Sequence, residues 1–160
     1  MSKLEFDVET VLAPEQVRAA LLDFSERRPD LWPELSRKQF EVYSVRADEA
    51  DVREGSELPF MTIWAKEHYE WPQPNVIRWT AHESNFCKPG SYMQTALHER
   101  AGGGTRIHVE WDRTGTGIGG RFLVAMVRLM RGKPVQANLA KALRAMEEKQ
   151  PPPRAAEPAS

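Results

Sequence analysis

Apolar and polar residues alternate along most of this chain, a period of two that is typical of β-strands with one buried face. In the first such segment Leu4, Phe6 and Val8 alternate with Glu5 and Asp7. The same pattern predicts seven strands, over residues 3–11, 39–46, 50–54, 61–71, 76–83, 91–100 and 105–113. Turn-forming residues separate them, including a predicted turn at Gly55-Ser56. Because the connections between consecutive strands are short, we expect an antiparallel sheet.

Helical periodicity appears near both ends of the chain. Pro14 and Glu15 begin an amphipathic segment, and a short second turn or helix follows between Pro29 and Pro33, where Trp32 is expected to fill the core. Residues 120–148 predict one long apolar helix. Pro134 interrupts it, and proline removes a helical hydrogen bond, so we predict a kink or break there.

This order of elements predicts an α+β fold in which a curved antiparallel sheet wraps around a long C-terminal helix. Two short helices come between the first and second strands. Such a sheet tends to leave a cavity between itself and the helix. The sequence therefore favours a protein that holds an apolar small molecule.

Composition narrows the class of protein. The 160 residues carry 41% hydrophobic residues and a net charge of -1, so nothing in the bulk charge indicates binding to nucleic acid or to an anionic membrane. No apolar stretch reaches bilayer length, and residues 1–5 carry no signal-peptide pattern. Cys87 is the only cysteine, which excludes an intrachain disulfide and favours the cytoplasm. We expect a single domain over residues 1–149 and a disordered Pro/Ala-rich tail over residues 150–160.

Several short segments carry a resemblance to a known superfamily. Residues 12–17, 22–24, 31–33 and 103–107, in this order, resemble the START-like, or helix-grip (SRPBCC), superfamily over roughly residues 3–148. Trp64 with residues 67–71, 83–85, 89–91 and 111–113 is similar to polyketide cyclase/dehydrase-type proteins. The resemblance implies a curved seven-stranded antiparallel sheet around a long C-terminal helix. It does not specify a function, because this fold hosts carriers, cyclases and regulatory modules.

Strand alternation selects the residues expected to face the cavity. On the long strand Ala65, Glu67 and Tyr69 fall on the inward face and Trp64 on the other. Tryptophans suit aromatic pocket walls because they offer a large rigid apolar area. Ordinary core packing is the alternative for each of these residues. The candidate ligand-binding residues are Trp64, Trp71, Trp79, Met93, Thr95, Leu97, Val109, Trp111, Phe122, Met126 and Met130.

Glu67, Tyr69 and Arg113 are the candidate catalytic residues. A buried carboxylate must be paired with a cation, hydrogen-bonded or protonated, so Glu67 is either an ion-pair partner of Arg113 or an acid or base with a raised pKa. Glu99 could take the place of Glu67 in that ion pair. However, Glu99 and Arg113 lie at the ends of strands, where a solvated position is expected for both. Glu83 is expected to point inward from the strand over residues 76–83.

No motif indicates a metal or a cofactor. The four histidines lie on different strands without the spacing of a metal site, and they are expected on the solvated face. The glycine-rich runs at residues 102–104 and 115–120 do not occur in the strand–loop–helix context of a phosphate-binding loop.

Three functions remain open. The first is binding of an apolar or aromatic small molecule, lipid-like or polyketide-like. The second is a polyketide cyclase or dehydratase, and the third is a protein-interaction module on the same fold. The sequence leaves the oligomeric state open between monomer and homodimer.

Overall fold

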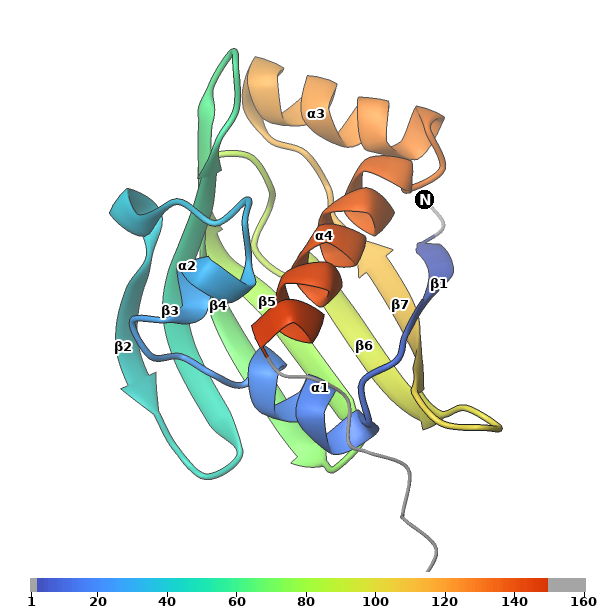
Figure 1. The fold of residues 1–160 in the computed structure, drawn as a ribbon. Coiled ribbons are helices and arrows are strands. Elements are labelled where there is room, and N and C mark those ends of the chain that lie inside the picture. The colour runs from blue at the N-terminus through green and yellow to red at the C-terminus, as the bar shows by residue number, and fades with distance from the viewer. Residues whose placement is uncertain (1–2, 150–160) are drawn as a thin grey trace, which may run out of the picture.

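The structure, a computed structural model, describes residues 3–149 as one antiparallel sheet curved around a C-terminal helix (Figure 1). The strands are β1 (Leu4–Thr10), β2 (Glu41–Val45), β3 (Glu49–Glu57), β4 (Thr62–Gln73), β5 (Val76–Ser84), β6 (Tyr92–Glu99) and β7 (Thr105–Asp112). The helices are α1 (Pro14–Leu21), α2 (Arg28–Leu31), the 3-10 helix η1 (Arg37–Gln39), α3 (Gly117–Leu129) and α4 (Lys133–Lys149). The predicted tail over residues 150–160 lies outside the described residues.

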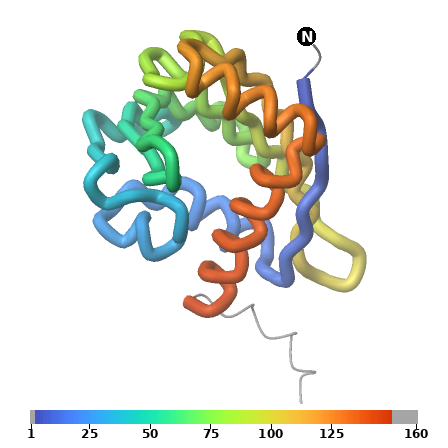
Figure 2. The backbone as a smooth tube through the Cα atoms, turned by 90° about the horizontal axis from the view of Figure 1, so that it is seen from above, coloured from blue at the N-terminus to red at the C-terminus, as the bar shows by residue number. Residues whose placement is uncertain are grey.

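The seven strands pair in the order β1-β7-β6-β5-β4-β3-β2, with every pair antiparallel. The first and last strands are therefore neighbours, and the two short helices of the β1–β2 connection cross to the opposite edge. Seen from above, α4 runs between β1 on one side and the β1–β2 connection on the other (Figure 2). This confirms the predicted helix-grip fold.

The predicted turn at Gly55-Ser56 is wrong, because β3 continues through both residues. Gly55 pairs with Trp64 of β4, and the turn follows at residues 58–61, where the amide of Leu58 donates to the carbonyl of Met61 at 2.8 Å. A side chain at position 55 would meet the Ile63 carbonyl oxygen at 2.2 Å. The glycine therefore permits close packing within the sheet and does not mark a turn.

The inward orientation predicted for Glu83 is also wrong. Lys66 pairs with Glu83, whereas the next residue, Glu67, pairs with Ala81, so His82 is an extra residue in β5. Such a bulge reverses the alternation of side chains beyond it. Glu83 consequently lies on the outer face, where it forms a 3.0 Å ion pair with Lys66.

The predicted interruption near Pro134 is a break, so the C-terminal segment forms two helices in place of one. Arg131 and Gly132 both adopt positive φ, 54° and 79°, and the Gly132 amide donates to the carbonyl of Val127 at 2.9 Å. This hydrogen bond closes the end of α3 in the manner of a Schellman motif. Pro134 is then the second residue of α4, where no helical hydrogen bond is lost.

The two ends of the space inside the sheet are filled differently. At one end, α1 and the C-terminal half of α4 pack a continuous core, which includes Val17, Leu21, Leu143 and Met146. At the other end α3 lies beyond the ends of the strands (Figure 1), and the first turns of α4 contact the sheet at β1, where Gln136 Nε2 donates to the carbonyl of Asp7 at 3.2 Å. The candidate site lies at this second end.

Candidate functional site

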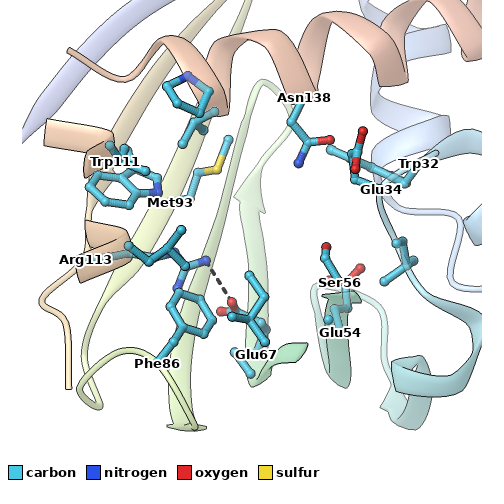
Figure 3. Close-up of a pocket in the computed structure, with 18 of the residues that line it drawn as sticks. Trp32, Glu34, Glu54, Ser56, Glu67, Phe86, Met93, Trp111, Arg113 and Asn138 are labelled. Carbon is cyan, nitrogen blue, oxygen red and sulfur yellow. Dashed lines mark hydrogen bonds and ion pairs between the residues drawn. The ribbon is translucent and has the colours of Figure 1, made fainter. Parts of the chain in front are cut away.

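A cavity of about 370 Å³ lies between the sheet, α3, the first turns of α4 and the segment that follows α2. Its walls are mostly apolar and aromatic (Figure 3). The apolar lining includes Ile63, Ala65, Trp79, Phe86, Met93, Trp111, Leu123, Val124 and Val127. Its volume and lining are those of a small-molecule pocket.

Glu67 and Arg113 form a buried ion pair on one wall of this cavity (Figure 3). Arg113 Nη2 donates to Glu67 Oε1 at 2.8 Å, and the two residues are 7% and 5% exposed. Among residues 3–149, the other carboxylate oxygen, Glu67 Oε2, is buried and has no hydrogen-bond partner. Glu67 lines the cavity, so this oxygen lies in the cavity wall.

Burial raises the pKa of Glu67 above its ordinary value, and the guanidinium of Arg113 only partly opposes that effect. The carboxyl group therefore accepts a proton more readily than an exposed glutamate. It is placed to act as a hydrogen-bond acceptor when ionised and as a donor when protonated.

A second charged group, formed by Arg28, Glu54 and Tyr69, borders the cavity. Arg28 Nε donates to Glu54 Oε2 at 2.9 Å, and its Nη2 donates to the Tyr69 hydroxyl at 2.9 Å. That hydroxyl donates to Glu54 Oε1. Burial, reinforced by Glu54, raises the pKa of Tyr69 well above its ordinary value, so the phenol keeps its proton.

Two more polar atoms in the cavity wall have no partner among residues 3–149. They are the indole Nε1 of Trp32, a donor, and the amide oxygen of Asn138, an acceptor. Figure 3 shows Trp32, Glu34 and Asn138 near one another, facing Arg113 and Glu67 across the cavity. Beside them Lys141 Nζ forms a 2.8 Å ion pair with exposed Glu34, which joins α4 to the segment after α2.

The structure brings six of the predicted site residues to the cavity. Glu67, Tyr69 and Arg113 line it, as do Trp79, Met93 and Trp111. The solvated position considered for Arg113 is wrong, whereas Glu99 is exposed as expected. The roles of these six residues in binding or catalysis stay predictions.

Two of the predicted tryptophans lie elsewhere. Trp64 is on the outer face of β4, where the Arg53 guanidinium stacks over its ring at 4.4 Å, because strand alternation points it away from Ala65 and Glu67. Trp71 is buried in the core beyond the cavity. It stacks on Phe24 and donates from Nε1 to the carbonyl of Ala47 at 3.0 Å.

Three further candidates, Thr95, Leu97 and Val109, face inward and are almost fully buried, but they do not line the cavity. They belong to the strands' inner face at the end that α1 and α4 cover. Alternation predicts which face a side chain occupies, but not whether a helix or a ligand covers it.

The three candidates on α3 are turned away from the cavity. Phe122 and Met130 are 58% and 45% exposed, and Met126 is only partly buried. Leu123, Val124 and Val127 line the cavity instead. Because α3 is apolar on more than one side, its periodicity does not identify its inner face.

Sequence reasoning missed Arg28, Glu54 and Asn138. Asn138 carried a signal, since it is a polar residue in the apolar face of α4, three positions after Val135. Trp32, expected to be a core residue, in fact borders the cavity. Nothing local in the sequence distinguishes Arg28 from an exposed arginine.

The fold also gathers histidines with carboxylates on the outer face of the sheet. Among residues 3–149, potential metal-ligand atoms of Asp51, His68 and His82 lie within 4.8 Å of one another. His68 Nδ1 is already hydrogen-bonded to Asp51 Oδ1 at 2.8 Å. We assign no metal to this group, which is separate from the cavity.

Comparison with known proteins agrees with this geometry. Residues 1–148 match the model of the family described as polyketide cyclase/dehydrase and lipid transport. The chain belongs to this family. No curated protein matches its sequence. Within the 147 residues described (3–149), no helix is long and apolar enough to cross a membrane.

Solved structures with the same fold include three of low sequence identity. The TTHA0849 protein from Thermus thermophilus superposes with a TM-score of 0.75 at 17% identity, over 93% of this chain and 99% of its own. The Zhui aromatase/cyclase from a Streptomyces species gives 0.73 at 12% identity, over 94% and 96%. A START superfamily protein from Mycobacterium smegmatis gives 0.72 at 18% identity, over 92% and 97%. These similarities show the fold.

Proposed function

We propose that this protein binds an apolar or aromatic small molecule in the cavity between its sheet and its C-terminal helices. The observation that carries the proposal is the 370 Å³ space with aromatic walls inside an otherwise packed interior. A cavity of this size holds a small multi-ring molecule or a short acyl chain.

The polar groups of the wall support a ligand that also carries oxygen atoms. Glu67 Oε2, Trp32 Nε1 and Asn138 Oδ1 lack partners, and a buried polar atom without a partner is costly. A ligand with a hydroxyl group at each end would satisfy them, because a hydroxyl can donate to Glu67 Oε2 or Asn138 Oδ1 and can accept from Trp32 Nε1. A pure hydrocarbon would leave them unsatisfied and is expected to bind less well.

Binding of an apolar fluorescent probe, 1-aminoanthracene, tests the proposal. Val127→Phe places an aromatic ring on the cavity side of α3. Ile118→Phe is the control, because it enlarges a side chain of the same helix at a position that is 92% exposed. We expect the wild type and Ile118→Phe to bind the probe and Val127→Phe to lose binding. Equal binding by all three folded proteins would exclude the cavity as the site.

A second candidate function, cyclisation or dehydration of a poly-keto substrate, is favoured by the state of Glu67. Its raised pKa and free Oε2 suit a general base that removes a proton from the carbon beside a ketone. The neighbouring guanidinium of Arg113 would stabilise the enolate oxygen that forms. Aromatase/cyclase proteins among the structures of the same fold add weight to this reading.

Substitutions at Glu67 and Tyr69 distinguish binding alone from catalysis. In a cyclase, Glu67→Gln should reduce turnover of a linear poly-β-ketoacyl thioester at least about a hundredfold while binding is retained. Tyr69→Phe should have a smaller effect, because the Tyr69 hydroxyl is already committed to Glu54 and Arg28. Unchanged turnover in Glu67→Gln would remove the catalytic role.

A further inference from the structure

Helix α3 carries a second apolar face that is largely exposed. Ile118, Phe122, Ala125 and Leu129 follow one another at spacings of four, three and four residues, so they form one stripe along the helix. Ile118 is 92% exposed and Leu129 is 84% exposed. The inward face is a separate set, Gly120, Val124 and Val127. An apolar stripe of this exposure is typical of a binding surface.

The exposed stripe continues onto the turn between β3 and β4. Phe60, at the tip of this turn, is 55% exposed, and its ring meets the ring of Phe122 edge-on at 6.1 Å between centroids. In Figure 1 the turn rises beside the start of α3 at the same end of the molecule. We call this surface the α3 patch; it consists of Phe60, Ile118, Phe122, Ala125, Leu129 and Met130.

Helix α3 and the turn that follows it carry basic residues and no acidic one. They contain Arg121, Arg128, Arg131 and Lys133. Arg121, Arg131 and Lys133 are exposed, whereas Arg128 is paired with Asp112 at 3.6 Å. The exposed charges on this helix and at its C-terminal end are therefore positive.

We propose that the α3 patch docks on the surface of an anionic phospholipid membrane, with α3 lying in the interface. An amphipathic helix with aromatic and aliphatic residues on one side and flanking Arg and Lys is the structure that binds such a surface. A second copy of this chain fits less well, because two basic patches would repel each other.

The α3 patch lies beside the cavity, so docking there would bring the cavity close to the membrane. Leu123 and Val127 of the same helix line the cavity, as does Leu58 of the β3–β4 turn. The two elements that would touch the membrane are thus the two that form this end of the cavity. An apolar molecule could pass between bilayer and cavity with little exposure to water.

Co-sedimentation of the full chain with vesicles tests the proposal. We expect binding to vesicles of equal parts phosphatidylcholine and phosphatidylglycerol at low salt. Vesicles of phosphatidylcholine alone should bind much less, and added salt should release the protein, because screening weakens surface attraction. Free inorganic phosphate at the same ionic strength should compete no better than chloride, which separates a membrane surface from a phosphate site.

Three variants identify the surface. Ile118→Ser/Leu129→Ser removes the apolar stripe and should abolish sedimentation. Arg131→Gln/Lys133→Gln should weaken it by about fivefold for each charge removed. Val45→Ser, at an apolar residue that is 54% exposed on the edge strand β2, is the matched control and should bind like the wild type.

Three results would overturn the proposal. The first is absence of binding to the anionic vesicles at low salt. The second is equal binding by the Ile118→Ser/Leu129→Ser variant. The third is a dimer in light scattering that this variant abolishes, which would assign the α3 patch to a second copy. The test does not depend on the proposed ligand, since Val127→Phe, with its cavity filled, should still sediment with vesicles.

Discussion

Arg113 and Glu67 meet inside the protein although 46 positions separate them, and only one oxygen of the carboxylate is used in their contact. The end of β7 supplies the guanidinium, and the middle of β4 supplies the acid. Because both side chains are almost fully buried, each depends on the other for compensation of its charge. The same two residues line the cavity, so a substitution at either one is expected to affect both the stability of the fold and the proposed binding site.

Removing one member of the pair should be more harmful than removing both. Arg113→Met leaves a buried carboxylate without its cation and should lower the free energy of unfolding by about 3–5 kcal/mol. The double variant Glu67→Leu/Arg113→Met should lose less than either single variant, and therefore much less than their sum. Urea denaturation of the four proteins measures this coupling, and additive losses would contradict it.

The ion pair of Lys66 with Glu83 is the matched control. It joins the same strand β4 to β5, but its side chains are 40% and 60% exposed. Lys66→Met should therefore change the free energy of unfolding much less than Arg113→Met does.

The raised pKa of Glu67 predicts a particular pH dependence. Its folded-state pKa lies above the ordinary value of 4.5, so between these two values the folded protein binds more protons than the unfolded chain. The contribution of Glu67 to stability is then complete below pH 4.5 and declines as the pH rises through the folded-state pKa. Carboxylates with lowered pKa values, such as Asp7 and Asp51, act in the opposite direction.

Comparison with Glu67→Gln isolates this effect. Glutamine has nearly the same shape and does not titrate, so the stability of the wild type relative to this variant should fall as the pH is raised from about 4 to 8. Chemical denaturation at several pH values measures the difference. A relative stability that rises over this range would show that Arg113 lowers the pKa of Glu67 instead.

Arg28 should be among the most sensitive positions in the chain. It is 1% exposed, and it contacts Glu54, the Tyr69 hydroxyl and the carbonyl oxygens of Leu21 and Asp23. Arg28→Met removes every one of these hydrogen bonds and leaves Glu54 without its cation. We expect a loss of about 3–5 kcal/mol in the free energy of unfolding.

Arg27→Met is the control for this position. Arg27 is the neighbouring residue, and its ion pair with Asp23 leaves its own side chain 78% exposed. The expected change is below about 1 kcal/mol. Similar losses in the two variants would mean that burial at position 28 is not what holds this segment in place.

The sequence predicted the strands, their antiparallel arrangement and an interruption at Pro134, because these follow from local pattern and from short connections. The inner residues of β4 followed from alternation alone, and Glu67 and Tyr69 were placed on the cavity face. Alternation failed at Glu83, where one extra residue, His82, reverses it. A bulge of this kind is set by pairing between strands and leaves no local signal.

The cavity itself was less predictable than the fold. It depends on where α3 begins, which of its apolar sides turns inward, and where the segment after α2 lies. Phe122 and Val124 are both apolar residues of one helix, yet only Val124 lines the cavity. Arg28 contacts Tyr69 across 41 positions, a pairing that only the tertiary structure brings about.

The position of α3 depends on a glycine, which provides the last test. A side chain at Gly120 would meet the Phe86 carbonyl oxygen at 2.2 Å, an atom of the backbone that cannot move aside. Alanine is the better helix former by about 1 kcal/mol, but the clash should outweigh this gain, so Gly120→Ala should destabilise the protein by about 1–3 kcal/mol. At Gly119 the nearest atom is Met61 Sδ at 2.9 Å, the flexible end of a side chain, so Gly119→Ala should be close to neutral. Thermal denaturation distinguishes the two variants, and a stabilised Gly120→Ala protein would mean that α3 does not pack against residue 86 in this way.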